Sequence, residues 1–313
     1  DVAYNSLLVR SRREIHQKVG RAIETLYPQR RDELCETLAH HYSRAEDLEK
    51  AHEYFRLSGE KAYRNSSMSE AIRHFQESLG ALKRLPDTKQ NKMRIVEVTL
   101  LAWQPMLALG CREGSLEILK EGERLAEELG DKKRLTQLCG FIAHYLSYRG
   151  DSTRGYQYAR KALAEAERTG DVESAVWAAA NFIGPVCYRG DFAEAASISA
   201  RAVDLIEKTG KSAERLGHDV PLYPTLIAVN GLATGMLGEF AEGEPRCERI
   251  GRVAAESGRA SALAVAEVIC GWVSVVRGKD ITSCQKHLHN AIHHSEKSGF
   301  GAWLGLAWSC LGW

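Results

Sequence analysis

Apolar residues in the first part of the chain recur at helical spacing. Between residues 7 and 26, leucine, isoleucine and valine recur at roughly helical spacing, with Arg and Lys between them. This pattern predicts an amphipathic helix that buries one face. Pro28 ends it, because proline cannot continue a helix. Two further helices are predicted over residues 31–42 and 47–65. A fourth is predicted to begin after Ser67, with Glu70 three residues later as in a capping box.

Glycines divide the pattern at regular intervals from residue 110 onward. One glycine is predicted to end the first helix of each repeat, and another to end the second, because glycine adopts the left-handed conformation without a Cβ clash. The first set is Gly110, Gly150, Gly190, Gly238 and Gly278, and the second is Gly130, Gly170, Gly210, Gly258 and Gly299. The two glycines of a repeat are 20 or 21 residues apart, and successive repeats are offset by 40, 40, 48 and 40 residues. A fixed period in this range is typical of a helical solenoid.

Each first glycine is followed, five positions later, by a small residue, which two helices need where they cross closely. These residues are Ser115, Gly155, Ala195, Gly243 and Ser283. The strings GDSTRGYQYARKALAEAERTGD and GDFAEAASISARAVDLIEKTG resemble the second helix of a tetratricopeptide unit. That family usually repeats every 34 residues or so, so the resemblance is to an extended variant. The predicted fold class is all-α: a tetratricopeptide-like α-solenoid, in which about fifteen helices form antiparallel pairs and a right-handed superhelix.

Prolines indicate where this regular pattern changes. The polar segment 85–92 contains Pro86 and is interpreted as a linker, which divides N-terminal helical repeats (residues 28–86) from the extended repeats (residues 87–313). Pro105 and Pro185 each precede a repeat glycine by five residues and predict matching kinks. Pro221 and Pro224 fall in an eight-residue insertion, after which a helix is predicted to begin near Leu222. A functional loop and a tolerated surface insertion both remain open for that segment.

Composition narrows the class of partner. The 42 Lys plus Arg residues nearly balance the 41 Asp plus Glu residues among 313, which gives no electrostatic reason to expect nucleic acid or a membrane surface. The eight cysteines are dispersed without a C-x-x-C pair, as in a reduced, cytoplasmic protein. No run of eighteen apolar residues is apparent. The first residue is not methionine and the last segment is apolar, so we expect a fragment of a longer protein. That segment predicts self-association through Trp303, Leu306, Trp308 and Leu311.

Motifs for catalysis or cofactors are missing from the sequence. It has no P-loop, dinucleotide fingerprint, G-x-S-x-G or H-E-x-x-H, and we expect no catalytic residue and no cofactor. The densest group of potential ligands is QKHLHNAIHHSEK, in which His289 and His293 share a helix face. They are a weak metal candidate, because a catalytic zinc site takes three protein ligands and no third is evident. His40 and His41 are adjacent and point to different faces, which favours packing or capping.

A groove is the remaining candidate site. In a tetratricopeptide stack the first helix of each unit lines the concave surface, and counting back from the glycines places six residues there. They are Gln137, His144, Tyr148, Trp177, Tyr188 and Trp272. Aromatic and amide side chains suit a bound protein or peptide segment. For Trp177 and Trp272 a core position is the favoured alternative, since large aromatic residues mostly fill cores.

The N-terminal region carries a more specific resemblance. Residues 4–79, and above all LAHHYSRAEDLEKAHEYF, strongly resemble the region that follows the ATPase module in bacterial multidomain adenylate/guanylate cyclases. LAWQPMLALG, from Leu101 to Gly110, resembles the proline-bearing first helix of the same tail. The resemblance implies that residues 1–27 end the winged-helix part of a signal-transduction ATPase with numerous domains (STAND). The family's catalytic motifs would lie upstream, so none of its catalytic residues has a counterpart here.

Together these observations predict a non-catalytic sensor region of a signalling cyclase. It would bind a protein or peptide in its groove and relay that event to the upstream ATPase and cyclase modules. An alternative is the inducer-sensing tail of a large ATP-dependent transcriptional activator. A third hypothesis, from another class, is a metal-dependent enzyme centred on His289 and His293.

Overall fold

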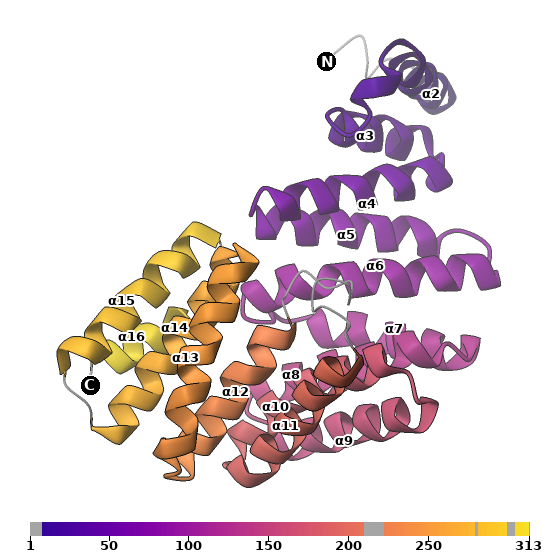
Figure 1. Ribbon diagram of the computed structural model, residues 1–313. Coiled ribbons are helices and arrows are strands. Elements are labelled where there is room, and N and C mark those ends of the chain that lie inside the picture. Colours follow the sequence, from indigo (N-terminus) through magenta and orange to yellow (C-terminus); the bar gives the residue numbers. More distant parts are fainter. Residues whose placement is uncertain (1–7, 210–221, 279–280, 299–303, 313) are drawn as a thin grey trace. The chain divides into compact units, whose positions relative to one another are not determined.

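Every regular element that the structure describes is a helix. The computed structural model describes residues 8–209, 222–278, 281–298 and 304–312, and these form fifteen α-helices and one short 3-10 helix (Figure 1). The all-α class predicted from the sequence is therefore confirmed for the described residues. The chain divides into two compact units, which we call the first unit (residues 1–131) and the second unit (residues 132–313).

The first unit contains six of the α-helices, and consecutive helices contact each other. They are α2 (Val9–Leu26), α3 (Cys35–Ala45), α4 (Leu48–Arg64), α5 (Met68–Lys83), α6 (Lys89–Ala108) and α7 (Ser115–Leu129), with the 3-10 helix η1 (Pro28–Arg30) between α2 and α3. The predicted helix over residues 31–42 begins later than expected, at Cys35, because Pro28 starts the 3-10 turn and residues 31–34 continue as turns. The predicted linker is partly helical, since Thr88 caps α6 by accepting a hydrogen bond from the backbone N–H of Asn91. The domain boundary after residue 86 stays a prediction.

The predicted capping box at Ser67 is wrong. Ser67 does stand at the N-cap of α5, but its side chain makes no capping hydrogen bond. Glu70 instead accepts hydrogen bonds from Arg73 one turn further along the helix. The neighbouring helix shows the cap that its sequence suggests, because Asp47 accepts a hydrogen bond from the backbone N–H of Lys50 at the start of α4.

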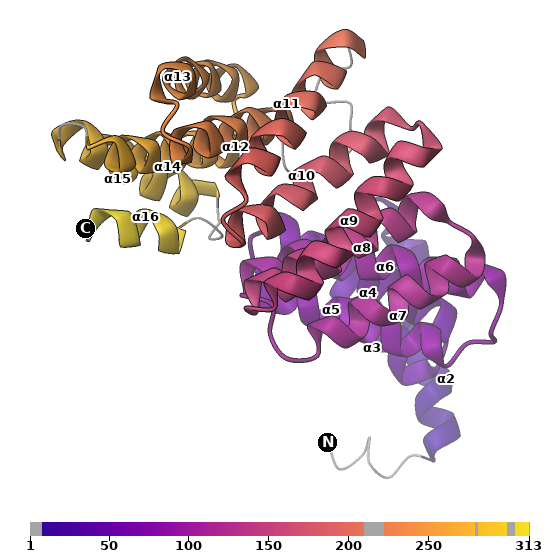
Figure 2. The same ribbon diagram turned by 90° about the horizontal axis from the view of Figure 1, so that it is seen from below.

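The second unit is a series of helix pairs. Its helices are α8 (Lys132–Tyr148), α9 (Ser152–Thr169), α10 (Val172–Tyr188), α11 (Phe192–Thr209), α12 (Leu222–Met236), α13 (Phe240–Ser257), α14 (Ala260–Arg277), α15 (Ile281–Ser298) and α16 (Leu304–Leu311). Each helix contacts the next, and the first helices of successive pairs also stack, α8 on α10, α10 on α12, α12 on α14 and α14 on α16. Figure 2 shows α12, α14 and α15 side by side. Nearest-neighbour stacking of this kind is how a helical repeat buries its apolar faces.

The repeat glycines end helices as predicted wherever the structure describes them. Eight of the ten have a positive φ, between 65° and 91°: Gly110, Gly130, Gly150, Gly170, Gly190, Gly238, Gly258 and Gly278. The other two, Gly210 and Gly299, lie outside the described residues. The insertion also lies outside the described residues as far as Pro221. Helix α12 begins at Leu222, as expected. Pro105 and Pro185 both lie inside their helices.

The small residues predicted at helix crossings bring helices close together. A Cβ atom on Gly155 would lie 2.1 Å from Ser147 Oγ and 2.8 Å from the backbone oxygen of Ala143. On Gly243 it would lie 3.4 Å from the backbone oxygen of Gly231. At Gly155 only a residue without a side chain allows the two helices to approach this closely, whereas at Gly243 a Cβ atom would just reach van der Waals contact.

One helix corrects the expectation about apolar runs. The 18 residues of α14 have a mean hydropathy of 1.6, enough to cross a membrane by length and composition alone. Half of this helix is buried inside the protein, and it contacts α12, α13, α15 and α16. Packing against four helices accounts for its apolar composition, because a helix buried on most sides is apolar all round.

The last helix is better covered than its sequence suggested. Leu306 and Leu311 of α16 pack against the apolar core of the second unit, which includes α14 and α15. Trp308 remains 55% exposed, and Trp303 lies outside the described residues. Self-association through this helix stays a prediction, with Trp308 as its remaining exposed aromatic residue.

Candidate functional site

The six predicted groove residues lie on three first helices of the second unit. Gln137, His144 and Tyr148 belong to α8, Trp177 and Tyr188 to α10, and Trp272 to α14. Tyr148 is 50% exposed, and Gln137 is half-buried. Both are accessible to a partner, although a partner-binding role for them stays a prediction. The side chain of Tyr188 lies outside the described residues.

Trp177 belongs to the core and does not line a groove. It is 3% exposed, and its ring packs edge-to-face on Phe141 with the ring centroids 5.3 Å apart. Its ring also packs against Gly140, where an added Cβ atom would lie only 2.6 Å from the ring. Trp272 is half-buried against the same core. The favoured core interpretation is thus the observed one for Trp177, because the long helices place this position toward α8.

His144 lies where α8 packs on α10. Its Cε1 atom is 3.4 Å from the place of a Cβ atom on Gly184 of α10. Burial lowers the pKa of His144 to about 4, so its imidazole is neutral at pH 7. A neutral imidazole held between two helices suits packing and offers no charge to a partner.

A hollow of about 830 Å³ lies in the first unit, in a place that the sequence did not indicate. It is lined by residues of α2, α3, α4 and α5. Four arginines and four glutamates contribute to it: Arg12, Arg13, Arg44 and Arg73, and Glu36, Glu46, Glu70 and Glu77. This volume lies in the range of protein sites for small ligands. The balanced charges suit a ligand that carries both signs.

Most of these charges already have partners within the protein. Glu46 pairs with Arg13, and Glu70 with Arg73. Glu36 accepts a hydrogen bond of 2.7 Å from Nζ of Lys61. In contrast, Arg44 and Glu77 are exposed and have no ion-pair partner among the described residues. The hollow therefore presents one cation on α3 and one anion on α5 that an occupant can pair with.

His74 adds a buried polar group to the same hollow. Its side chain is 7% exposed and lies beside Phe55, with the ring centroids 6.1 Å apart. Nη2 of Arg73 lies 3.1 Å from its Nε2, so we assign Nε2 as the acceptor and Nδ1 as the protonated nitrogen. Nδ1 is buried without a hydrogen-bond partner among the described residues. An unpaired buried donor costs about 1 to 3 kcal/mol, and an acceptor atom on a ligand would recover part of it.

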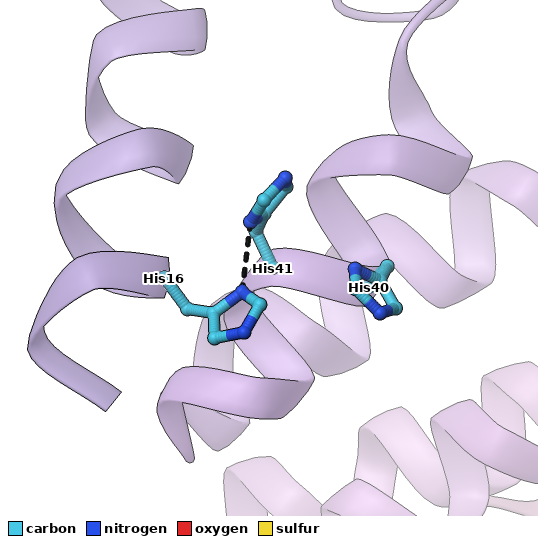
Figure 3. Close-up of side chains that lie close together, drawn as sticks. All are labelled: His16, His40 and His41. Carbon is cyan, nitrogen blue, oxygen red and sulfur yellow. Dashed lines mark hydrogen bonds between the residues drawn. The ribbon is translucent and has the colours of Figure 1, made fainter. Parts of the chain in front are cut away.

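Three histidines meet at one edge of the first unit (Figure 3). His16 comes from α2, and His40 and His41 from α3. The Nδ1 atoms of His16 and His41 are 2.9 Å apart, and one ring nitrogen from each of the three residues lies within 4.8 Å of the other two. His16 is buried, His41 is half-buried, and the exposed His40 also lines the hollow.

Sequence reasoning missed this cluster because it considered His40 and His41 on their own helix. They do point in different directions, but His16, on the preceding helix, lies close to both, with its ring centroid 5.6 Å from that of His40 and 5.1 Å from that of His41. The available signal was the proline between the two helices, since two helices joined by a short turn pack against each other. Periodicity alone does not reveal which faces then meet.

The C-terminal histidines do not form a comparable group. Nδ1 of His289 bonds the backbone oxygen of Gln285 in its own helix at 2.7 Å, and Nδ1 of His287 lies 2.6 Å from a carboxylate oxygen of Glu267. Within the described part of the chain, His16, His40 and His41 are the single group of three or more His, Cys, Asp or Glu residues placed closely enough to share a metal ion. The described residues therefore supply no third ligand for the predicted pair His289 and His293.

Comparisons with known proteins place the fold. No protein-family model and no curated protein matches the sequence. Among solved structures, a Rap protein complexed with Competence and Sporulation Factor matches with a TM-score of 0.60 and 12% identity, over 88% of this chain and 78% of that chain. The Rap conjugation gene regulator of the plasmid pLS20, in complex with the Phr* peptide, matches with a TM-score of 0.63 and 12% identity, over 85% of this chain and 73% of that one.

A third match comes from a signalling ATPase. A STAND protein with a tetratricopeptide repeat sensor from Pyrococcus horikoshii matches with a TM-score of 0.52 and 15% identity, over 93% of this chain and 43% of that chain. The fold follows from these likenesses. This chain is a tetratricopeptide-like helical-repeat protein. The repeat fold predicted from the glycine spacing is thus confirmed. The chain spans less than half the length of the STAND protein that it resembles.

Proposed function

We propose that this chain is a peptide-binding regulatory region and catalyses no reaction itself. The observation that carries the proposal is the hollow of the first unit. There, among the described residues, a buried nitrogen of His74 has no hydrogen-bond partner, and the charges of Arg44 and Glu77 have no ion-pair partner. Such a surface suits recognition, because convergent polar groups in a concave site fix the orientation of a ligand. One of the similar structures holds the Phr* peptide, which supports a peptide as the class of occupant.

The charges define the peptide that would fit. An acidic side chain or a terminal carboxylate would pair with Arg44, and a lysine or arginine of the same peptide would pair with Glu77. A backbone carbonyl would accept the hydrogen bond that Nδ1 of His74 offers. The expected ligand is thus a short segment that carries charges of both signs.

Regulation would follow from the helices that the occupant joins. A peptide that contacts both α3 and α5 would stabilise the conformation in which the distance between these helices fits the peptide. Binding would shift the protein toward that conformation. We further propose that the parent protein is a multidomain adenylate/guanylate cyclase in the cytoplasm, with its STAND ATPase module before residue 1. The resemblance of residues 4–79 to that family supports this parentage, as does the likeness to a STAND protein with a repeat sensor. The full-length sequence decides: a DNA-binding module after residue 313 would favour the transcriptional activator instead.

A peptide display screen tests the binding proposal. A library of random seven-residue peptides would be selected on the whole 313-residue chain and, in parallel, on the Arg44→Glu and His74→Phe variants. We expect the selected peptides to carry both charges and to bind the two variants at least about tenfold more weakly. Arg84→Glu is the matched control, because Arg84 is exposed and does not line the hollow.

Two results would contradict the proposal. One is a selection that yields the same peptides on the parent chain and on the Arg44→Glu variant. The other is loss of binding in the Arg84→Glu control, since that would indicate attraction to net charge and no defined site. A peptide with its acidic residue changed to lysine should regain binding to Arg44→Glu, which separates a direct contact from damage to the fold.

A further inference from the structure

We propose that His16, His40 and His41 form a binding site for Zn²⁺ that joins α2 to α3. Three imidazoles from two helices converge there, and one ring nitrogen from each lies within 4.8 Å of the other two. The site is separate from the hollow's charged pairs and does not depend on the proposed peptide function. It also differs from the C-terminal pair His289 and His293.

The spacing of the ligand atoms agrees with zinc. Zinc bonds imidazole nitrogen at about 2.0 to 2.1 Å in a tetrahedron, which places two such nitrogens about 3.3 Å apart. The Nδ1 atoms of His16 and His41 are 2.9 Å apart and face each other (Figure 3). A small separation of these two rings would admit the ion between them. His40 is exposed, so its ring is free to turn toward the same point.

The hydrogen bond between two of the rings also suits a metal. Imidazole binds a metal ion through an unprotonated ring nitrogen. The Nδ1 atoms of His16 and His41 already face each other as a hydrogen-bonded pair, so an ion held between them would take the place of the shared proton.

Three protein ligands leave one tetrahedral position open. His40 lines the hollow, so this position is expected to hold water or an oxygen atom of whatever occupies the hollow. Arg44 lies close enough to His16 to interact with it electrostatically, and its positive charge opposes a second cation. We therefore expect weaker binding than at a closed, four-ligand structural zinc site.

The test measures zinc binding to the whole chain prepared without a histidine tag. After removal of metal by a chelator, the protein would be titrated with Zn²⁺ against a colorimetric chelator and with Co²⁺ by visible absorption. We expect one equivalent of Zn²⁺ and a tetrahedral Co²⁺ spectrum. Replacement of one direct ligand, in His16→Gln, His40→Gln or His41→Gln, should weaken binding by about 100-fold.

The controls distinguish this site from adventitious binding. The double variant His289→Gln/His293→Gln should bind Zn²⁺ as the parent does. His40 is exposed, so His40→Gln should fold even if His16→Gln does not, and circular dichroism would confirm it. Zn²⁺ should also slow amide hydrogen exchange in α2 and α3 and leave α15 unchanged.

Three results would overturn the site. They are the absence of stoichiometric Zn²⁺ in the parent chain, binding that His40→Gln leaves unchanged, and binding that the double variant of His289 and His293 removes. Because the peptide screen uses different variants, failure of the zinc site leaves the proposed function standing, and the reverse also holds.

Discussion

The two compact units hold their helices together in different ways. In the second unit the described residues with positive φ are all glycines, and at Gly155 and Gly243 two helices of a pair meet almost backbone to backbone. In the first unit, Glu46, Ser66 and Cys111 adopt positive φ without being glycine. The second unit is therefore built from close, uniform crossings, whereas the first accepts local strain at its helix ends.

Polar side chains take a larger part in the first unit. Glu24 of α2 accepts hydrogen bonds from the hydroxyls of Tyr42 at 2.6 Å and Tyr54 at 2.5 Å, and from Nζ of Lys50 at 2.6 Å. The two tyrosine rings are stacked with their centroids 5.7 Å apart. This network ties α2 to α3 and α4, which also carry the hollow and the histidine cluster. Backbone contacts thus hold the regular unit together, whereas the irregular unit relies on a polar network between the helices that line the hollow.

The largest expected effect breaks a crossing in the second unit. Gly155→Ala would place a Cβ atom 2.8 Å from the backbone oxygen of Ala143, so the helices must separate. We expect a loss of about 3 kcal/mol in the free energy of unfolding of this unit, measured by urea denaturation. The matched control is Gly251→Ala in α13, where a Cβ atom has open space. There the better helix propensity of alanine should add about 0.5 to 1 kcal/mol. Similar results for the two variants would show that the crossings are not tight.

The next effect removes the carboxylate that joins three helices of the first unit. Glu24→Ala leaves the buried hydroxyls of Tyr42 and Tyr54 without their acceptor, which should cost about 2 to 3 kcal/mol. Glu14→Ala is the control, because Glu14 sits on the same helix in an exposed pair with Arg10. We expect it to change stability by less than about 0.5 kcal/mol. Amide hydrogen exchange in α2 measures both effects. If the two substitutions lower stability equally, the network around Glu24 does not hold α2 in place.

A pH titration tests a feature that both units share. His52 in the first unit is 6% exposed and bonded to Oγ of Ser78 at 2.8 Å, and burial, with Arg94 and Arg56, lowers its pKa to about 4. Its unfolded pKa is near 6.5, so the unfolded chain takes up a proton between pH 6.5 and pH 4 while the folded chain does not. Its contribution to stability is therefore complete above pH 6.5 and is lost as the pH falls toward 4. The difference between the two pKa values implies an effect of about 2.5 kcal/mol at pH 4.5, because each pKa unit corresponds to about 1.4 kcal/mol.

His52→Gln should reduce this pH dependence in the first unit and leave the second unit unchanged. His144→Gln is the matched variant, because burial lowers the pKa of His144 to about 4 as well. Hydrogen exchange at pH 4.5 and pH 7, read separately for peptides of each unit, measures both effects. An equal change in both units after either substitution would contradict the assignment.

The contrast between the units also explains what the sequence could predict. Glycine at a helix end is a local requirement of the backbone, so its spacing predicted the repeats. The prolines of the insertion likewise predicted the start of α12 near Leu222. Glu46 and Ser66 are 20 residues apart, the same interval as a glycine pair, but without glycine that repeat went unnoticed. The burial of Trp177 and the meeting of His16 with His41 depend on how one helix is rotated against another. Hydrophobic periodicity does not determine that rotation closely enough.

The smallest expected effect tests whether the helix ends differ only in residue type. Ser66 is exposed and has a φ of 59°, a conformation that is strained for a residue with a side chain. Gly190 has a φ of 81° without strain, because glycine has no side chain. Ser66→Gly should raise the free energy of unfolding of the first unit by about 0.5 to 1 kcal/mol, because relief of strain exceeds the extra entropy of the unfolded glycine. Gly190→Ala should lower that of the second unit by about 1 kcal/mol. Opposite signs in the two variants would show that both units use the same left-handed helix end. A loss at Ser66 would instead mean that the serine side chain stabilises its turn, and the comparison between the units would then extend to the turns themselves.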